Sequence, residues 1–152
     1  MGLEYGTKVP CKPRGKAGGM KKARILLADD HPHLVEKVTQ LLQSEYEVLG
    51  AVSDGQALVS AAEKLKPDVL VVDVTMPILD GIEAAKRLKA RACESKIVFL
   101  TVHSDPDYLR ACLAAGGLGY VAKSRMSSDL ARAVEHALAE QIFISPTMTG
   151  QQ

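Results

Sequence analysis

The stretch VLVVDVTMP, residues 69–77, joins an unbroken run of four apolar residues to an aspartate and then to a loop that contains a proline. A strand that is apolar on both faces is typical of a parallel sheet, because helices cover both sides of such sheets. The run stops at Asp73, which places this carboxylate at the carboxyl end of the strand. The stretch therefore predicts a parallel strand with Asp73 at the sheet edge where α/β proteins bind ligands.

The same plan is repeated along the rest of the chain. Four further short apolar runs, at residues 25–28, 48–52, 97–100 and 120–122, alternate with segments whose apolar residues recur at helical spacing. This alternation predicts an α/β fold with a parallel sheet covered by helices on both faces. Because crossovers between parallel strands are right-handed, we expect a doubly wound five-stranded sheet.

Polar residues and prolines indicate where some of the helices begin and end. Ser53 or Asp54 is expected to cap the second helix, which closes before Pro67. The last helix is expected to be capped near Ser127 or Ser128.

The charge of the chain divides between a basic start and a mildly acidic body. Residues 1–24 carry seven Lys or Arg against one acid, a net of +6, and the remainder carries a net of −5. We expect residues 1–20 to form a disordered basic leader, 21–145 to form the folded domain and 146–152 to begin a linker or tail. An acidic body argues against nucleic-acid binding by the domain itself.

The composition also indicates where in the cell the protein is expected and in which redox state its cysteines are. No stretch approaches the roughly 18–20 unbroken apolar residues of a membrane-spanning helix, so we expect a cytoplasmic protein without membrane contact. The three cysteines have no metal-like spacing, which favours reduced thiols.

Polar residues end four of the five apolar runs. They are the pair Asp29-Asp30 after the first run, Asp73 after the third, Thr101 after the fourth and Lys123 after the fifth. Because the carboxyl ends of parallel strands share one edge of the sheet, we expect these side chains to meet there. Each residue alone is more typical of a turn, a helix cap or a surface position, but together they favour a functional site.

The chemistry of this set points to phosphoryl transfer. Carboxylates held close together repel unless a cation neutralises them, and carboxylate oxygens with water are the ligands that Mg²⁺ prefers. An aspartate can accept a phosphoryl group, which makes Asp73 the candidate nucleophile. Lys123 is expected to pair with a phosphate oxygen, and Thr101 is expected to donate a hydrogen bond to another.

At these residues the chain resembles the receiver domain of bacterial response regulators, the CheY-like family. The resemblance covers about residues 21–145 and implies a flavodoxin-like sheet with strand order 2-1-3-4-5. The residues that carry it are Asp29-Asp30, residues 73–77, Asp80-Gly81, Thr101, and Tyr120 three residues before Lys123.

The resemblance implies a phosphorylation switch with Mg²⁺ as cofactor. A sensor histidine kinase would phosphorylate Asp73, and Mg²⁺ would be bound directly by Asp30, Asp73 and the backbone carbonyl of Thr75, with Asp29 acting mainly through water. Thr101 and Lys123 would hold the phosphoryl group. Tyr120 would change rotamer together with Thr101 and so alter the surface next to the fifth strand.

Three details resemble the NarL/FixJ (LuxR-type) group of regulators: Asp-His-Pro after the first run, Gly-Tyr before Val-Ala-Lys, and the ending Ile-Phe-Ile-Ser-Pro. Such regulators continue into a helix-turn-helix domain, so DNA would be contacted only through an output domain absent from this chain. We expect a fragment of a longer regulator in preference to a stand-alone receiver, with a homodimer as a further expectation.

Three further residues near the expected site bear on its loops and its chemistry. Ser124 follows Lys123 where many receivers have a proline in a cis peptide, so a cis bond is in doubt here. Thr75 and His103 lie where they would tune hydrolysis of the phosphoryl group.

Two other functions are compatible with parts of the pattern. A phosphatase of the haloacid-dehalogenase class also uses an aspartate nucleophile with Mg²⁺, but it would need a second aspartate where Thr75 stands. A receiver that serves only as a dimerisation module would keep the site unused. We expect no enzymatic activity beyond the phosphorylation and dephosphorylation of the chain itself.

Overall fold

The computed structural model describes residues 22–103 and 105–146, which form alternating strands and helices. The predicted leader, residues 1–20, and all but the first residue of the predicted tail lie outside the described residues. The elements are β1 (Arg24–Ala28), α1 (Pro32–Leu42), β2 (Glu47–Val52), α2 (Gly55–Leu65), β3 (Val69–Asp73), α3 (Gly81–Ala90), β4 (Lys96–Thr101), α4 (Pro106–Ala114), β5 (Gly117–Ala122), the 3₁₀ turn η3 (Lys123–Arg125), α5 (Met126–Leu138) and β6 (Phe143–Ile144).

All neighbouring strands pair in parallel, in the order β2-β1-β3-β4-β5-β6. The predicted order of the first five strands is therefore confirmed. The sixth strand was not predicted, because two residues are too few to form a recognisable apolar pattern. Phe143 pairs with Gly119, and Ile144 pairs with Tyr120, so the end of the domain lies directly beside β5.

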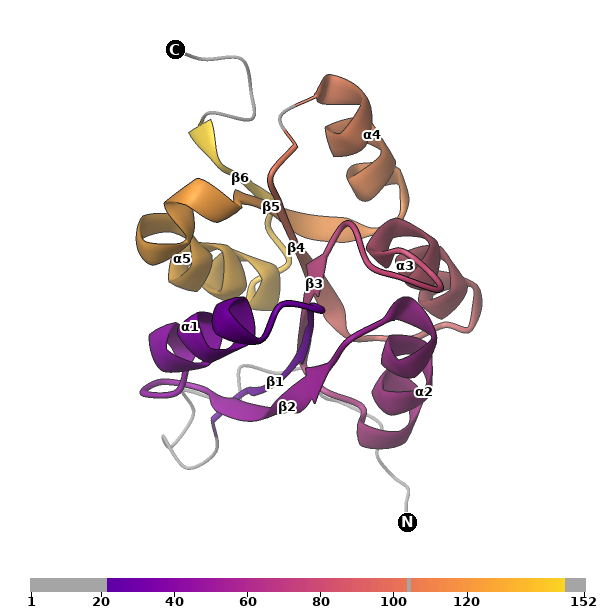
Figure 1. Cartoon of the computed structure of the whole chain (residues 1–152), viewed down its shortest axis with the longest axis horizontal. Coiled ribbons are helices and arrows are strands. Elements are labelled where there is room, and N and C mark those ends of the chain that lie inside the picture. The colour runs from indigo at the N-terminus through magenta and orange to yellow at the C-terminus, as the bar shows by residue number, and fades with distance from the viewer. Residues whose placement is uncertain (1–21, 104, 147–152) are drawn as a thin grey trace.

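The sheet separates two hydrophobic cores, as predicted for a doubly wound fold. Figure 1 shows α1 and α5 on one side of the sheet and α2, α3 and α4 on the other. Alternation along β1 divides its side chains between them: Ile25 and Leu27 pack in the core with α1 and α5, whereas Leu26 and Ala28 pack in the core with α2 and α3. The strand β3 is buried along its whole length, as its unbroken apolar run predicted.

The helix boundaries follow local signals only in part. The Asp54 side chain accepts a hydrogen bond from the backbone N–H of Ala57 and caps α2, as predicted, and α2 ends at Leu65, before Pro67. The predicted start of the last helix at Ser127 or Ser128 is wrong. The turn η3 leads directly into α5 at Met126, so the helix begins without a side-chain cap.

The described residues bear on the predicted state of the cysteines and on the predicted lack of a membrane-spanning helix. Cys93 and Cys112 are free thiols, and Cys11 lies outside the described residues. Across the part of the chain that the structure describes, every helix is too short or too polar to cross a bilayer.

Candidate functional site

The fold brings the predicted strand-end residues to one edge of the sheet. Asp73 is the last residue of β3 and Thr101 is the last residue of β4, while Asp29 and Lys123 directly follow β1 and β5. The register places Asp73 beside Leu100, so that Thr101 lies one residue further along the edge. These positions follow from strand length and pairing, which is why the sequence pattern could predict them.

Asp29, Asp73 and Lys123 form the buried centre of the site. The Lys123 Nζ lies 3.2 Å from Asp73 Oδ2 and 3.4 Å from Asp29 Oδ2. The two carboxylates are about nineteen-twentieths buried, with side-chain exposures of 4% for Asp73 and 5% for Asp29. Apart from the ion pairs with Lys123, neither Oδ2 atom has a partner among the described residues. One ammonium group thus faces two buried carboxylates.

The imbalance of charge changes the acidity of Asp73. Burial raises the pKa of the Asp73 carboxyl above its ordinary value, and the Asp29 carboxylate raises it further. The ammonium of Lys123 and the backbone N–H of Thr75, which donates to Asp73 Oδ1 at 3.2 Å, act in the opposite direction without cancelling the shift. Burial and the neighbouring Asp29 carboxylate therefore destabilise the ionised form of Asp73, and a bound cation would relieve this.

We expect Asp73→Asn to stabilise the protein at neutral pH when divalent cations are absent. A carboxyl group whose folded-state pKa is raised stabilises the fold below its unfolded pKa, and this contribution is lost as the pH rises through the folded pKa. Removal of the ionisable group should therefore raise the free energy of unfolding by about 1 kcal/mol at pH 7, with no gain at acidic pH.

Urea denaturation in EDTA, repeated from about pH 4 to about pH 8, measures this difference. Added Mg²⁺ should stabilise the wild-type protein and leave the variant almost unchanged, because only a cation-binding folded state gains from the ion. A wild-type protein that is more stable than Asp73→Asn at neutral pH in EDTA would contradict the expectation.

The carboxylates form the kind of oxygen cluster that binds a divalent cation. One ligand atom from each of Asp29, Asp30, His31 and Asp73 lies within 4.8 Å of all the others. The Oδ2 atoms of Asp29 and Asp73 are a further sign that the pocket fits a cation, since these two buried carboxylate oxygens share the single ammonium of Lys123 and have no other partner among the described residues. Asp30 is more exposed than the other two carboxylates and would keep water at the ion.

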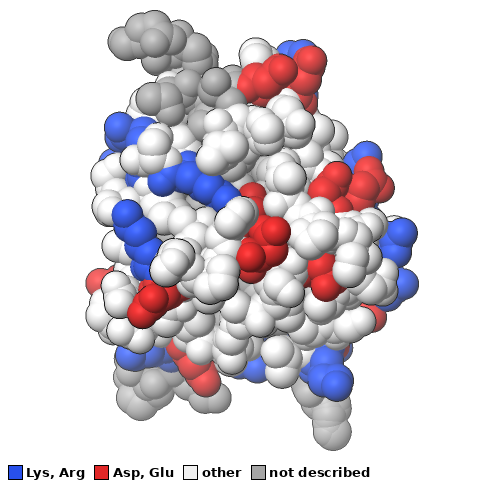
Figure 2. All heavy atoms as spheres, in the orientation of Figure 1, with Lys and Arg blue, Asp and Glu red and all other residues white. Residues whose placement is uncertain are grey.

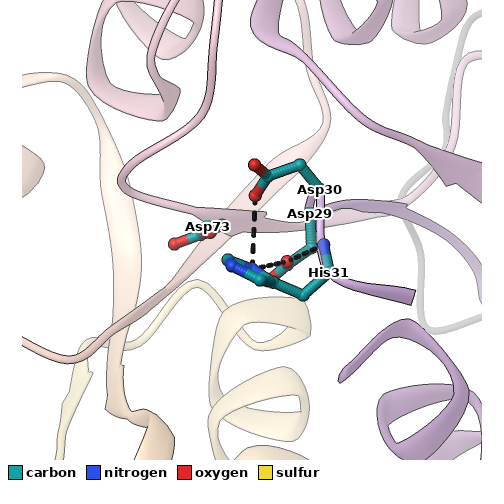
Figure 3. Close-up of side chains that lie close together, drawn as sticks. All are labelled: Asp29, Asp30, His31 and Asp73. Atoms are coloured by element: carbon teal, nitrogen blue, oxygen red, sulfur yellow. Dashed lines mark hydrogen bonds and ion pairs between the residues drawn. The ribbon is translucent and has the colours of Figure 1, made fainter. Parts of the chain in front are cut away.

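His31 is the member of this cluster that the sequence pattern did not identify. Its Nδ1 lies 2.9 Å from Asp29 Oδ1 and 3.2 Å from Asp30 Oδ1, and its backbone N–H donates to Asp29 Oδ1 at 2.8 Å. The hydrogen bond to Asp29 and the charge of Asp30 raise the pKa of the imidazole. Figure 3 shows the ring of His31 lying among the three carboxylates. The motif Asp-His-Pro was the only signal in the sequence, and it was interpreted as a sign of the subgroup alone.

Thr101 and Tyr120 meet through the loop that follows β4. Thr101 Oγ1 accepts a hydrogen bond from the backbone N–H of His103 at 2.9 Å. The hydroxyl of Tyr120 donates to the carbonyl of the same residue at 3.4 Å. Tyr120 is buried, and burial raises the pKa of its hydroxyl to about 12. The structure thus joins the two expected switch residues to one loop segment.

His103 also links two loops of the site. Its Nε2 lies 3.3 Å from Thr75 Oγ1, and its ring stacks on Tyr108 with centroids 4.1 Å apart. The contact joins the loops after β3 and β4. Near the same edge, the described residues contain no cis peptide bond, which gives Lys123–Ser124 the trans form.

Charge on this side of the molecule is mixed. Figure 2 shows acidic atoms near the middle of the viewed face with a basic side chain directly beside them, and charges of both signs are spread around the rim. This distribution gives the viewed face no basic stripe of the kind that tracks a nucleic-acid backbone.

Comparison with protein families gives one match to the greater part of the chain. Residues 25–135 match the model of the response regulator receiver domain. The nitrate/nitrite response regulator NarL of Escherichia coli strain K12 is 33% identical over 129 residues, which are 84% of this chain and 60% of NarL. The transcriptional regulatory protein DegU of Brevibacillus brevis is 33% identical over 130 residues, 84% of this chain and 55% of DegU.

Solved structures show the same similarity. A two-component response regulator of the LuxR family from Aurantimonas sp. SI85-9A1 has a TM-score of 0.81 at 30% identity, with 86% of this chain and 95% of that chain covered. The isolated REC domain of RcsB from Salmonella enterica serovar Typhimurium, solved with the phosphomimetic BeF3-, has a TM-score of 0.78 at 27% identity, with coverages of 86% and 98%.

Proposed function

Because this chain belongs to the response regulator receiver domain family, we propose that Asp73 is its phosphoryl-accepting residue and that a sensor histidine kinase is the donor. The family matches confirm the resemblance predicted from the sequence, and the general function of the family is a phosphorylation-dependent switch. The observation that carries the assignment of Asp73 is its buried carboxylate, paired with Lys123 at the carboxyl edge of the sheet.

In the proposed reaction, a carboxylate oxygen of Asp73 attacks phosphorus. The new bond joins that oxygen to phosphorus, the bond from phosphorus to the donor nitrogen breaks, and the nitrogen keeps the electron pair and is protonated as it leaves. Asp30, Asp73 and the backbone carbonyl of Thr75 would hold Mg²⁺ directly, with Asp29 acting through water. The bound ion would offset negative charge on the transferring group.

Lys123 and Thr101 would receive the phosphoryl oxygens. The ammonium of Lys123 already lies within 3.4 Å of both buried carboxylates, so it can pair with a phosphoryl oxygen once Asp73 is phosphorylated. Thr101 would turn its hydroxyl toward the new group and give up the hydrogen bond from the His103 backbone N–H. Tyr120 would respond because its hydroxyl is bound to the same residue, which couples the site to the surface around β5.

The chain spans between 55% and 64% of the length of the first four curated relatives that it matches. We therefore propose residues 21–145 as the receiver, with a helix-turn-helix output domain in the whole protein as the part that contacts DNA. Dimerisation of the receiver and a cytoplasmic location complete the proposal. Receiver domains are generally not enzymes, and we propose that this chain catalyses only its own phosphorylation and dephosphorylation.

Incubation with acetyl phosphate and Mg²⁺, followed by intact-mass measurement, tests the proposal. The wild-type chain should gain one phosphoryl group that is labile to alkali, and Asp73→Asn should gain none. Asp107→Asn, which changes an exposed carboxylate of α4, is the matched control and should be phosphorylated like the wild type.

The other outcomes separate the two alternative functions. A chain that takes up no phosphoryl group from acetyl phosphate or from a histidine kinase would be a dimerisation module and not a switch. Steady turnover of many phosphoesters would instead indicate a phosphatase, which Thr75 argues against because that class needs a second aspartate there.

A further inference from the structure

The acidic pocket contains one nitrogen ligand atom in addition to its oxygens. His31 Nδ1 lies 2.9 Å from Asp29 Oδ1 and 3.2 Å from Asp30 Oδ1. Neighbouring ligands of an octahedral ion with bonds of about 2.1 Å lie roughly 3.0 Å apart. The imidazole nitrogen and the Asp30 Oδ1 atom, 3.2 Å apart, are therefore spaced like neighbouring ligands of one ion. In Figure 3 the imidazole ring is also seen to lie beside Asp73.

The burial and charge of the two central carboxylates are a second sign that the pocket fits a cation. Asp29 and Asp73 are more than nine-tenths buried, and apart from the ion pair with Lys123 the Oδ2 atom of each has no partner among the described residues. The single ammonium of Lys123 faces both atoms, so one negative charge in the centre of the pocket is left over even before Asp30 is considered. One ligand atom of His31 and one from each of Asp29, Asp30 and Asp73 lie within 4.8 Å of one another, so an ion held by the carboxylates would lie beside the imidazole.

We propose that His31 makes the pocket a mixed nitrogen and oxygen site, which binds divalent ions of the first transition series, such as Ni²⁺, more tightly than Mg²⁺. The inference rests on the proposed function, because the same pocket would hold Mg²⁺ for phosphorylation of Asp73. Mg²⁺ prefers oxygen and retains water, so it gains little from an imidazole, whereas Ni²⁺ binds imidazole well. His31 would thus set which ion the receiver takes.

The contacts of His31 allow it to change partner at small cost to the fold. His31 is the N-cap residue of α1, but its side chain makes no capping hydrogen bond. An ion bonded to Nδ1 takes the place of the hydrogen now shared between the imidazole and Asp29. The backbone N–H of His31 keeps its own hydrogen bond to Asp29 Oδ1, so the start of α1 stays in position.

His33 provides the matched control. It is an exposed histidine in the first turn of α1, two residues after His31, and it is not a member of the cluster. A nonspecific histidine effect on Ni²⁺ binding would appear in both variants, whereas a ligand role belongs to His31 alone. The third histidine near the site, His103, is already bonded to Thr75 and stacked on Tyr108.

The test is competition calorimetry of the untagged chain with Ni²⁺ and with Mg²⁺, at one mildly alkaline pH. His31→Ala should weaken Ni²⁺ binding at least about tenfold and change Mg²⁺ binding less than about twofold, while His33→Ala should change neither. In nuclear magnetic resonance spectra of the wild-type chain, substoichiometric Ni²⁺ should broaden the ring signals of His31 before those of His33. Thermal melts without metal should show that both variants remain folded.

Several results would overturn the inference. They are unchanged Ni²⁺ affinity in His31→Ala, an equal loss for Ni²⁺ and Mg²⁺, and an equal effect of His33→Ala. The proposed function is tested separately by the mass gain of Asp73 in Mg²⁺. A chain that passes the calorimetric test but takes up no phosphoryl group would keep the metal inference and lose the switch.

Discussion

Replacement of Gly81 by alanine is expected to lower the free energy of unfolding by about 2–3 kcal/mol. A Cβ atom on Gly81 would lie 2.2 Å from the carbonyl oxygen of Asp73 and 2.8 Å from Cγ1 of Val72. Neither atom can move easily, because β3 is held on both sides by β1 and β4. In a helix without such a clash, alanine is more stabilising than glycine by roughly 0.5–1 kcal/mol. The steric penalty at Gly81 must therefore exceed that gain.

The same change should also slow phosphorylation, because the added methyl group would press on the backbone carbonyl of Asp73 itself. The backbone N–H of Gly81 donates to the Val74 carbonyl at 2.9 Å and fixes α3 against the end of β3. A displaced α3 would move the Asp73 carboxylate away from Lys123, which now lies 3.2 Å away. Urea denaturation measures the first effect, and the rate of mass gain from acetyl phosphate measures the second.

Gly50→Ala is the control for glycine replacement in general. Gly50 has a φ of +154°, but a Cβ there would meet nothing within 4 Å, so only backbone strain of about 1 kcal/mol is expected. Phosphorylation of this variant should match that of the wild type. Equal losses of stability in the two variants would show that the contact with Asp73 is not the cause.

The positions of the strand-end residues could be predicted because they follow from the parallel arrangement of the strands and do not depend on particular side-chain contacts. Parallel strands of similar length end at one edge, so Asp73, Thr101 and Lys123 had to be neighbours once the apolar runs were identified. The same reasoning accounts for the two cores, since alternation along β1 assigns each side chain to one face.

Features that depend on side-chain direction or on distant contacts could not be predicted in the same way. His31 follows the acidic pair, but only the turn into α1 brings its ring back over the carboxylates. The strand β6 has two residues and forms because α5 ends where the chain can return beside β5. The start of α5 was placed too late because a serine is a common cap, whereas here η3 continues directly into the helix.

Asp129 is a further residue whose surroundings the sequence pattern concealed. It lies in the first turn of α5, where an acid is common at the surface, yet it is fully buried. Arg125 Nε donates to its Oδ2 at 2.8 Å, and the hydroxyl of Ser145 donates to the same atom at 2.7 Å. The backbone N–H of Ala122 in turn donates to Ser145 Oγ at 3.1 Å. Through this chain of bonds, Asp129 ties the end of β6 to the residue before Lys123.

Asp129→Ala is therefore expected to lower the free energy of unfolding by about 3 kcal/mol, because it leaves the buried hydroxyl of Ser145 and the partly buried guanidinium of Arg125 without their acceptor. The matched control is Asp107→Ala, which removes an exposed carboxylate paired with Arg110 in α4 and should cost at most about 0.5 kcal/mol. Denaturation of the three proteins in urea at pH 7 measures both differences. Similar losses in the two variants would contradict a special role for the buried network.

The pH dependence of the stability difference separates the contribution of the Asp129 charge from the contribution of its packing. Burial alone would raise the pKa of this carboxyl, but the hydrogen bonds from Arg125, Ser145 and Ser128 outweigh burial and hold the pKa below its ordinary value. A carboxyl group with a depressed folded-state pKa stabilises the fold above its unfolded pKa of about 3.9, and the contribution is lost as the pH falls through the folded value. The difference between wild type and Asp129→Ala should thus be constant from neutral pH down to about pH 5 and shrink below about pH 4. A difference that persists unchanged in acid would assign the loss to packing, because the ionised carboxylate would then contribute nothing to the link between β6 and the edge that holds Lys123.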